Sequence, residues 1–364
     1  MNATKADKRG VGFFVSGYAR PGQPGILKCR LDPQTGDIET LAANDELRKP
    51  SWVLCHPEKP LRYSVEEFGP EGALAVLDIA GGGMRKLGSW STRGADPCHL
   101  SLTPDLKHLL VYNYTGGSLA VFALGPDGMP QGMTDFRQHR FADGAPAGGI
   151  PGRQAEPHVH FALCDGERVF VNDLGMNRVF LYGWDNARGA LRDDPEAIEF
   201  PDAAGPRHLA FGGDGARLYV LCELSAEIHV FSRGGDGRWR REQIAPVLPE
   251  DFGDFAKYDW SVSAALHFAD ARTLCASSRG HNSLAVFDVD GDGRLSNRRI
   301  FASGGVTPRE FMIAGDWLLV ANQDSDRVAR FRREGAGYVP AGPGLEAVRP
   351  TCLCRIPEST VMRR

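Results

Sequence analysis

Polar side chains recur at two equivalent places along the chain, where buried strands ordinarily carry apolar residues. One row follows a proline and comprises Ser51, Cys98, His158, Arg207, Arg309 and Thr351. The other row ends apolar runs and comprises Glu67, Asn113, Asp173, Glu223, Arg279 and Asn322. A buried charge is costly unless it is paired or faces water, so Arg207, Glu223 and Arg279 are expected to line a wet pocket. The amides and Asp173 have a simpler alternative, which is hydrogen bonding to the backbone of a neighbouring unit.

An acid, an imidazole and guanidinium groups in one cavity could carry out acid–base chemistry on an anionic molecule. His158 could act as a general acid or base near neutral pH. Arg207 and Arg279 could bind a carboxylate or a phosphate bidentately. The same arginines would lower the pKa of Glu223 and weaken it as a base.

The two rows arise from a repeated unit of three apolar strands separated by turns. Copies begin at Pro50, Pro97, Pro157, Pro206 and Pro308, and a copy without the proline begins at Val262. A spacing of roughly 45 to 60 residues, with strands in each unit, is typical of the blades of a β-propeller. Equivalent positions in such a ring lie at the same end of the channel, so the rows predict one shared site.

The two ends of the chain supply the missing pieces of one more unit. The segment GFFVSGYARPGQPGILKCRLD resembles the second and third strands of a copy, and RPTCLCRI resembles a first strand with Pro350 in the usual place. A blade shared by both ends closes a ring without exposed edges. We therefore predict an all-β fold, a seven-bladed propeller of four-stranded blades, as a single domain over residues 1–364 with a flexible tail at 1–10.

Composition excludes some partners. The chain has 42% hydrophobic and 24% charged residues and a formal net charge of −4, so nothing attracts it broadly to nucleic acid or to an anionic membrane. No long apolar stretch or signal-like segment is evident. The eight scattered cysteines are interpreted as buried, reduced thiols, and the predicted location is the cytoplasm.

Two motifs could bind a metal, but another interpretation is favoured for each. His158 and His160 form an H-x-H, which on a strand would place both rings on one face, yet no acidic residue completes a ligand set. The segment DVDGDG from Asp288 begins like a calcium loop, but its twelfth position is Arg299 instead of glutamate. A hairpin turn is predicted there, and no metal or cofactor is expected.

Several motifs together resemble the seven-bladed propeller lactonase family, which includes propeller-type 6-phosphogluconolactonases and the fungal carboxymuconate cyclase. They are RQAEPHVH, VNDLGMNRV, GPRH, LCELS, SSRGHNSL, TPREF and VANQDSDRV, and the resemblance spans residues 11–355. It implies a site on one face of the ring, without an obligatory metal. Residues proposed to act in the carboxymuconate enzyme match His158 (or His160), Arg207, Glu223 and Arg279. The predicted substrate-binding residues are His160, Glu67, Asn113, Asp173, His208, Arg309 and Asn322.

Three functions remain open at this point. The first is hydrolysis of an anionic sugar lactone, with 6-phosphogluconolactone as the expected substrate and no nucleic-acid or membrane partner. That reaction needs an activated water, a proton donor for the leaving alkoxide and donors for the oxyanion. Glu223 is its predicted base, since an activated lactone needs only a weak one, and His158 is the predicted proton carrier. The second is a lactonising cycloisomerisation of a carboxylated muconate, or hydrolysis of another lactone, in the same pocket. The third is a non-enzymatic propeller that binds a ligand or a protein, because a fold does not dictate a function. An apparent insertion at Asp251–Trp260 is expected to overhang the pocket.

Overall fold

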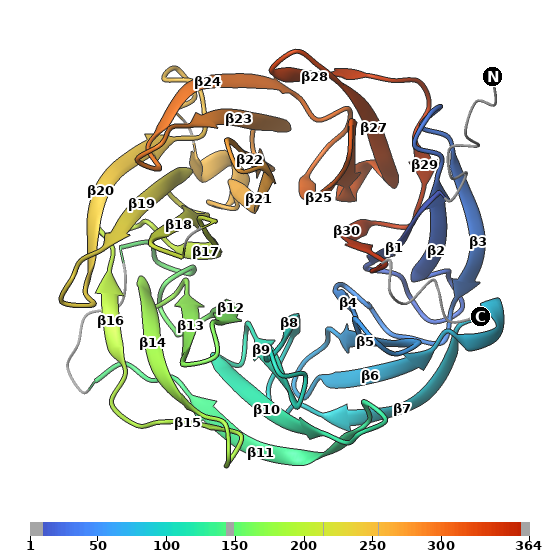
Figure 1. Cartoon of the computed structure of the whole chain (residues 1–364), viewed down its shortest axis with the longest axis horizontal. Coiled ribbons are helices and arrows are strands. Elements are labelled where there is room, and N and C mark those ends of the chain that lie inside the picture. Colours follow the sequence, from blue (N-terminus) through green and yellow to red (C-terminus); the bar gives the residue numbers. More distant parts are fainter. Residues whose placement is uncertain (1–9, 143–148, 214, 254, 358–364) are drawn as a thin grey trace, which may run out of the picture.

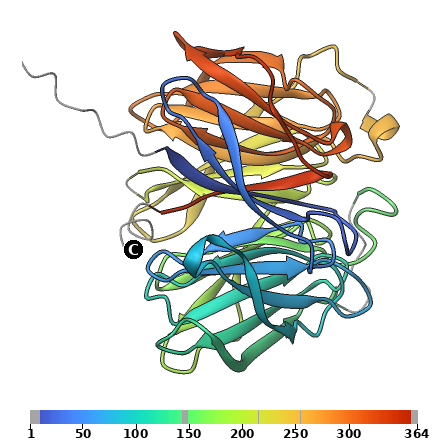
Figure 2. The same cartoon turned by 90° about the vertical axis from the view of Figure 1, so that its right-hand side faces the viewer.

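The described residues form seven antiparallel sheets arranged as blades around a central channel (Figure 1). The computed structural model describes residues 10–142, 149–213, 215–253 and 255–357. The expected tail at 1–10 lies outside these residues except for Gly10. Seen from the side, the ring is shorter along its channel than across its diameter (Figure 2). The predicted seven-bladed all-β propeller is confirmed.

The innermost strand of each blade lines the channel, and the second strand pairs with it. The innermost strands, from blade 1 to blade 7, are β4 (Val53–Cys55), β8 (Pro97–Leu102), β12 (Val159–Cys164), β17 (Pro206–Phe211), β21 (Ser263–Asp270), β25 (Pro308–Ala314) and β30 (Pro350–Arg355). The second strands, in the same order, are β5 (Leu61–Glu66), β9 (His108–Asn113), β13 (Arg168–Asp173), β18 (Arg217–Cys222), β22 (Thr273–Ser278), β26 (Trp317–Asn322) and β1 (Val11–Gly17).

The third strands are largely buried, whereas the fourth strands form the outer edge of each blade and are more exposed and more polar. The third strands are β6 (Ala73–Asp78), β10 (Ser118–Leu124), β14 (Arg178–Asp185), β19 (Glu227–Arg233), β23 (Ser283–Val289), β27 (Arg327–Glu334) and β2 (Ile26–Leu31). The fourth strands are β7 (Arg85–Ser91), β11 (Pro130–Gln138), β20 (Trp239–Pro246), β24 (Leu295–Ala302) and β3 (Ile38–Asn44). In blades 3 and 6 the outer edge is divided, into β15 (Ala190–Leu191) with β16 (Glu196–Glu199) and β28 (Gly337–Pro340) with β29 (Leu345–Glu346).

The ring closes in blade 7, where the two ends of the chain share one sheet. The strand order is β3-β2-β1-β30, and β1 pairs with β30 so that Val15 lies opposite Leu353. This confirms the predicted use of Pro350 as the start of an innermost strand. Closure leaves no innermost strand unpaired at the seam, which removes an exposed sheet edge.

A shift in strand pairing recurs at one end of the channel and sets the direction of side chains there. In six blades the pairing of the first two strands shifts after the first residue of the innermost strand. Such a bulge leaves one residue unpaired and re-aims its side chain. In blades 2 to 7, the residue that follows the second strand donates its N–H to the carbonyl just before the innermost strand. In blade 1, Glu67 donates to the Lys49 carbonyl, ahead of β4, and Ser51 follows Lys49 at the spacing that the bulge residue has in the other blades. Each blade therefore has two equivalent positions.

We call these two sets of positions the bulge ring and the strand-end ring. The bulge ring consists of Ser51, Cys98, His160, Arg207, Ala264, Arg309 and Thr351. The strand-end ring consists of Glu67, Tyr114, Leu174, Glu223, Arg279, Gln323 and Tyr18. Blade 5 lacks the proline but keeps the register, with Ser263 as the first residue of its innermost strand.

Features away from this end of the channel also agree with the sequence-based expectations. All eight cysteines are free thiols. The acidic segment after Asp288 is a turn between β23 and β24, in which Asp290 accepts hydrogen bonds from the N–H groups of Asp292 and Arg294. Within the described residues, none of the helices combines the length and the apolar character that crossing a membrane requires.

Candidate active site

Glu223 and three arginines form a buried ionic cluster at the strand-end ring. The Oε2 atom of Glu223 accepts hydrogen bonds from Arg207 Nε at 2.9 Å and from Arg279 Nη2 at 2.8 Å. The side chains of Glu223 and Arg207 are only 4% and 3% exposed, so both charges have left bulk water. Burial opposes ionisation of Glu223, but Arg279, Arg153 and Arg207 outweigh it and hold its pKa well below the usual range. The structure therefore brings together three of the four predicted catalytic residues.

The third arginine of this cluster, Arg153, was not among the predicted site residues. Its Nη2 binds Glu223 Oε1 at 2.5 Å and the hydroxyl of Tyr114 at 3.2 Å. Its Nη1 binds the carbonyl of Asp259 at 2.7 Å, which ties the Asp251–Trp260 segment to the pocket. A signal was available, because Arg153 opens the RQAEPHVH motif. Its position in a connecting loop, outside both rows of the repeat, hid its role.

The opposite side of the pocket holds a second acid with neutral partners. Glu67 of blade 1 accepts a hydrogen bond from the Tyr18 hydroxyl at 2.8 Å and another from the Ser51 hydroxyl. Burial is the main cause that raises the pKa of Glu67, while Arg309, Ser51 and Tyr18 act in the opposite direction. Tyr18 was missed because its copy of the repeat is split between the ends of the chain.

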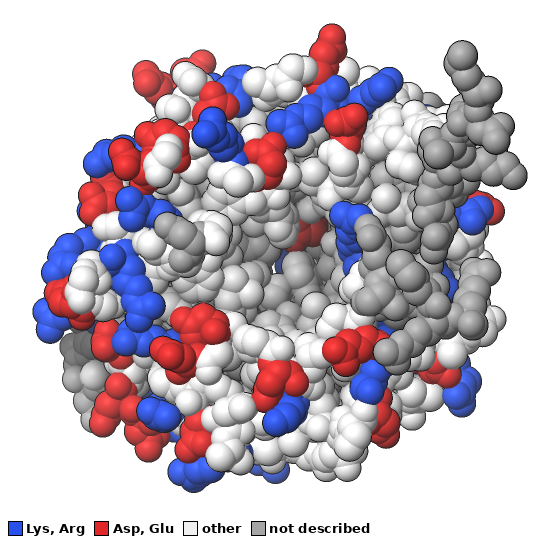
Figure 3. Space-filling model, viewed as in Figure 1, with Lys and Arg blue, Asp and Glu red and all other residues white. Residues whose placement is uncertain are grey.

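Arg309 lies between the two acidic groups. Its guanidinium lies over the ring of Tyr18, 5.0 Å from the centroid, and donates to Gln323 Oε1 at 3.3 Å. Burial opposes its charge, but electrostatic interactions with Tyr18, Glu67 and Glu223 outweigh burial and raise its pKa. The pocket therefore contains an excess of guanidinium groups over carboxylates. Figure 3 shows the opposite face of the ring, where the other end of the channel appears as a central hollow.

The two histidines of the H-x-H motif occupy different environments, which corrects one expectation. His158 precedes β12 instead of lying on it, and the register places His160 at the bulge position of Arg207. The His158 ring stacks on Tyr114 with centroids 4.5 Å apart, and its Nδ1 lies 3.0 Å from the Tyr114 carbonyl. A carbonyl only accepts, so Nδ1 carries the proton and Nε2 keeps a lone pair in the neutral ring.

His160 belongs instead to a buried group of imidazoles deeper in the channel. Its ring lies 5.7 Å from that of His208, which in turn lies 6.0 Å from His99. Burial, reinforced by the charge of Arg207, lowers the pKa of all three histidines well below the usual value. They are neutral at pH 7, and among the described residues neither ring nitrogen of His208 has a hydrogen-bond partner.

Asn113, Asp173 and Asn322 do not belong to the strand-end ring, which corrects their assignment as substrate-binding residues. Each is the last residue of a second strand, one position before the ring, and is 0% exposed. Asn113 donates to the Thr92 carbonyl and Asn322 to the Ser303 carbonyl. Asp173 accepts from the His158 N–H at 2.8 Å. The alternative of backbone hydrogen bonding, left open by the sequence, is the one observed.

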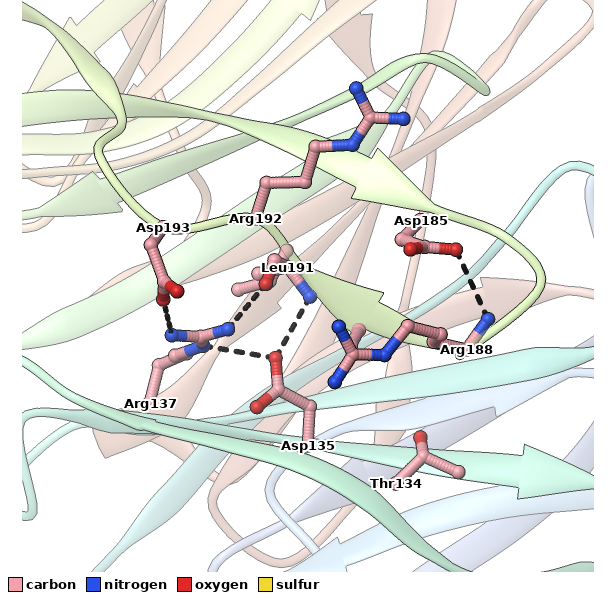
Figure 4. Close-up of a pocket in the computed structure, with 9 residues that line it drawn as sticks. Thr134, Asp135, Arg137, Asp185, Arg188, Leu191, Arg192 and Asp193 are labelled. Carbon is pink, nitrogen blue, oxygen red and sulfur yellow. Dashed lines mark hydrogen bonds and ion pairs between the residues drawn. The ribbon is translucent and has the colours of Figure 1, made fainter.

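A separate cavity of about 280 Å³ lies at the rim between blades 2 and 3 (Figure 4). Arg137 points toward two acids there, with Nε 3.0 Å from Asp135 and Nη1 2.5 Å from Asp193. It also donates to the Leu191 carbonyl. Arg188 and Arg192 also line this cavity, but Asp135, Asp185 and Asp193 equal the three arginines in number, so the rim cavity lacks the excess of arginines that characterises the central pocket.

Among the described residues, no group of three or more histidine, cysteine or acidic side chains is arranged to hold a metal ion. The polar chemistry of the pocket is therefore that of its guanidinium, carboxylate, hydroxyl and imidazole groups.

Comparison with known proteins agrees with this fold. Residues 12–339 match the family model described as lactonase, 7-bladed beta-propeller. A Bacillus subtilis (strain 168) protein named 6-phosphogluconolactonase is 27% identical over 330 residues, which are 88% of this chain and 90% of that protein. The chain therefore belongs to the seven-bladed β-propeller lactonase family.

Solved structures show the same relationship. The Pseudomonas aeruginosa periplasmic gluconolactonase is 29% identical, with a TM-score of 0.84 and coverage of 95% of this chain and 99% of that one. A Bacteroides fragilis structure, described only provisionally as a 6-phosphogluconolactonase, is 26% identical with a TM-score of 0.85. The match covers 98% of this chain and 100% of the Bacteroides fragilis chain.

Proposed function

We propose that this protein hydrolyses the lactone of an anionic sugar acid and that 6-phosphogluconolactone is its substrate. The observation that carries the proposal is the set of four arginines, Arg153, Arg207, Arg279 and Arg309, around a pocket with two carboxylates. An excess of fixed positive charge in a concave site attracts an anion and raises its local concentration. The Bacillus subtilis relative is named for the same reaction.

The arginines that can contact substrate are already oriented. Arg279 donates to Glu223 and to the Ser263 carbonyl, and its buried Nε has no partner among the described residues. A guanidinium edge held in this way can bind a phosphate or an oxyanion without losing much conformational entropy. Glu223 serves in this proposal as the counter-ion that orients the arginines, which differs from the base expected from the sequence.

A second candidate substrate is unphosphorylated gluconolactone, which the name of the Pseudomonas aeruginosa structure favours. The deciding experiment measures hydrolysis of both lactones at the same pH, corrected for spontaneous opening. A charged contact contributes about 1.5–3 kcal/mol, so kcat/KM for the phosphorylated lactone is expected to be higher by about tenfold or more. Equal values would favour gluconolactone, and turnover of neither compound would overturn the proposal.

A further inference from the structure

The two glutamates of the strand-end ring occupy equivalent positions but have different partners. In each case the residue at the bulge ring of the same blade provides a hydrogen bond: Arg207 to Glu223 in blade 4, and Ser51 to Glu67 in blade 1. A charged donor in one blade is therefore replaced by a neutral hydroxyl in the other. The same acid is placed twice in one pocket, in two electrostatic states.

Glu223 is poorly suited to accept a proton. Its Oε2 already binds two guanidinium groups and its Oε1 binds a third, from Arg153. Protonation would remove the negative charge that balances three buried cations, and such an imbalance is strongly unfavourable. This carboxylate stays ionised throughout a reaction cycle.

Glu67 has the features of an acid that exchanges a proton. Its hydrogen-bond donors are the neutral hydroxyls of Tyr18 and Ser51. The other ionisable groups around it are Arg309, Asp96 and Cys98. Burial raises its pKa, whereas that of Glu223 is lowered. Two acids whose environments push their pKa values apart are the usual arrangement for division of catalytic roles.

The position of Glu67 also directs it toward the proposed substrate site. Arg309 lies over the ring of Tyr18, the residue that donates to Glu67, and it interacts electrostatically with both Glu67 and Glu223. The Cys98 thiol lies at the bulge ring of blade 2. It interacts electrostatically with Glu67, Arg207, Arg309 and Glu223. All these groups surround the same end of the channel.

We propose that Glu67 is the acid–base residue of lactone opening, positioned by Tyr18 and Ser51, and that Glu223 only orients the arginines. This inference rests on the proposed lactone hydrolysis. In the first step, the Glu67 carboxylate takes a proton from water while the water oxygen bonds to the lactone carbonyl carbon. The resulting oxyanion faces the arginines. In the second step, the bond to the ring oxygen breaks, and the leaving oxygen takes that proton back from Glu67.

The atoms balance without a further reactant. One water is consumed, one carbon–oxygen bond forms and one breaks, and the product is a hydroxy acid that releases its proton to solvent. Glu67 ends as a carboxylate, as it began. Proton transfer by a positioned side chain contributes about 10²- to 10⁴-fold in rate.

His158 is the alternative base in the same region, and its place is less favourable. It occupies the position before the innermost strand, which the backbone bond from Leu174 defines and which Lys49 and Gly205 occupy in other blades. Its ring is stacked on Tyr114 and its Nδ1 faces a carbonyl. It borders the strand-end ring instead of belonging to it.

The test is Glu67→Gln, assayed with 6-phosphogluconolactone and gluconolactone beside the wild-type protein. The expected result is a fall in kcat of about 10²- to 10⁴-fold with KM nearly unchanged. The matched control is Glu66→Gln. Glu66 is the preceding residue, but it bonds to Lys86 at 3.0 Å and Ser89 at 2.8 Å, away from the pocket. Its substitution is expected to affect stability and leave kcat unchanged.

The pH profile separates a catalytic role from a structural one. Wild-type kcat is expected to fall on the acidic side as Glu67 becomes protonated. Tyr18→Phe removes a donor that favours the carboxylate, so this acidic limb of the pH profile is expected to move to higher pH. In Glu67→Gln the acidic limb is expected to disappear. A merely structural change would lower kcat at every pH without moving the limb.

Each outcome decides between named alternatives. If the wild-type protein turns over a lactone and Glu67→Gln keeps a comparable kcat, the role of Glu67 is wrong and the proposed function stands. If His158→Gln abolishes the acidic limb and Glu67→Gln does not, His158 is the base. If the wild-type protein opens neither lactone, both proposals are overturned together.

Discussion

Blade 1 and blade 4 present the same acid at the same ring position, yet the two acids have different properties. In blade 4, Arg207 and two further arginines enclose Glu223. In blade 1, Ser51 and Tyr18 donate hydroxyl groups to Glu67. The fold supplies one backbone position in both cases. The state of the carboxylate depends on the bulge-ring residue beside the adjacent strand, which shows how a repeat can place chemically distinct groups in one pocket.

The largest expected effect is on stability, and it compares the two acids directly. Glu223→Gln leaves buried guanidinium groups without their counter-charge, so it is expected to lower the free energy of unfolding by about 3–5 kcal/mol. Glu67→Gln, which replaces an acid held by neutral hydroxyls, is expected to change it much less. Urea denaturation of both variants measures the difference. Equal losses would contradict the distinction between the two blades.

The second prediction concerns the arginine side of the pocket. Arg279→Ala removes a charged contact of about 1.5–3 kcal/mol, so KM for 6-phosphogluconolactone is expected to rise roughly 10- to 150-fold. The rise should be smaller with unphosphorylated gluconolactone. Arg137→Ala, at the rim cavity, is the control and should leave KM unchanged. A rise of equal size for both lactones would place Arg279 away from the phosphate.

The third prediction uses pH, because the two acids should affect stability with opposite signs. The pKa of Glu223 in the folded protein lies below its ordinary value of 4.5. Its contribution is therefore present above pH 4.5 and is lost as the pH falls, by up to about 1.4 kcal/mol per pH unit. The pKa of Glu67 lies above 4.5, so its protonated form contributes at low pH and that contribution is lost as the pH rises.

Denaturation midpoints measured from pH 3 to pH 8 check these signs. Glu223→Gln should reduce the loss of stability in acid, and Glu67→Gln should reduce the loss on the alkaline side of pH 4.5. The same slope in both variants would mean that the two carboxylates titrate alike.

The smallest expected effect comes from a hydroxyl that supports the arginine side. Tyr114→Phe removes the acceptor for Arg153 Nη2, a contribution of about 0.5–1.5 kcal/mol. KM is expected to rise by roughly 2- to 10-fold while the pH dependence of kcat stays in place. Tyr18→Phe should instead shift the pH dependence of kcat and leave KM nearly unchanged. Steady-state kinetics of the two variants across pH compare the arginine side with the Glu67 side.

Much of the fold could be predicted because a propeller blade is a local unit. The recurring proline, the alternating apolar strands and the split seventh copy are all visible in the sequence, and the register of β30 on β1 confirms them. Arg207, Glu223 and Arg279 could be predicted as a group because buried charges require partners. Arg153 was missed although it opens the RQAEPHVH motif, because it comes from a loop that lies outside the repeat.

The chain by itself determined seven equivalent backbone positions and the residue types placed at each. Only the tertiary structure decided which of them face one another, because Asn113, Asp173 and Asn322 end their strands one residue before the ring that contains Glu67 and Glu223. An offset of one residue turns a strand side chain to the other face. That geometry, together with a loop that carries Arg153 to Glu223, turns similar acids into groups with different charges and roles.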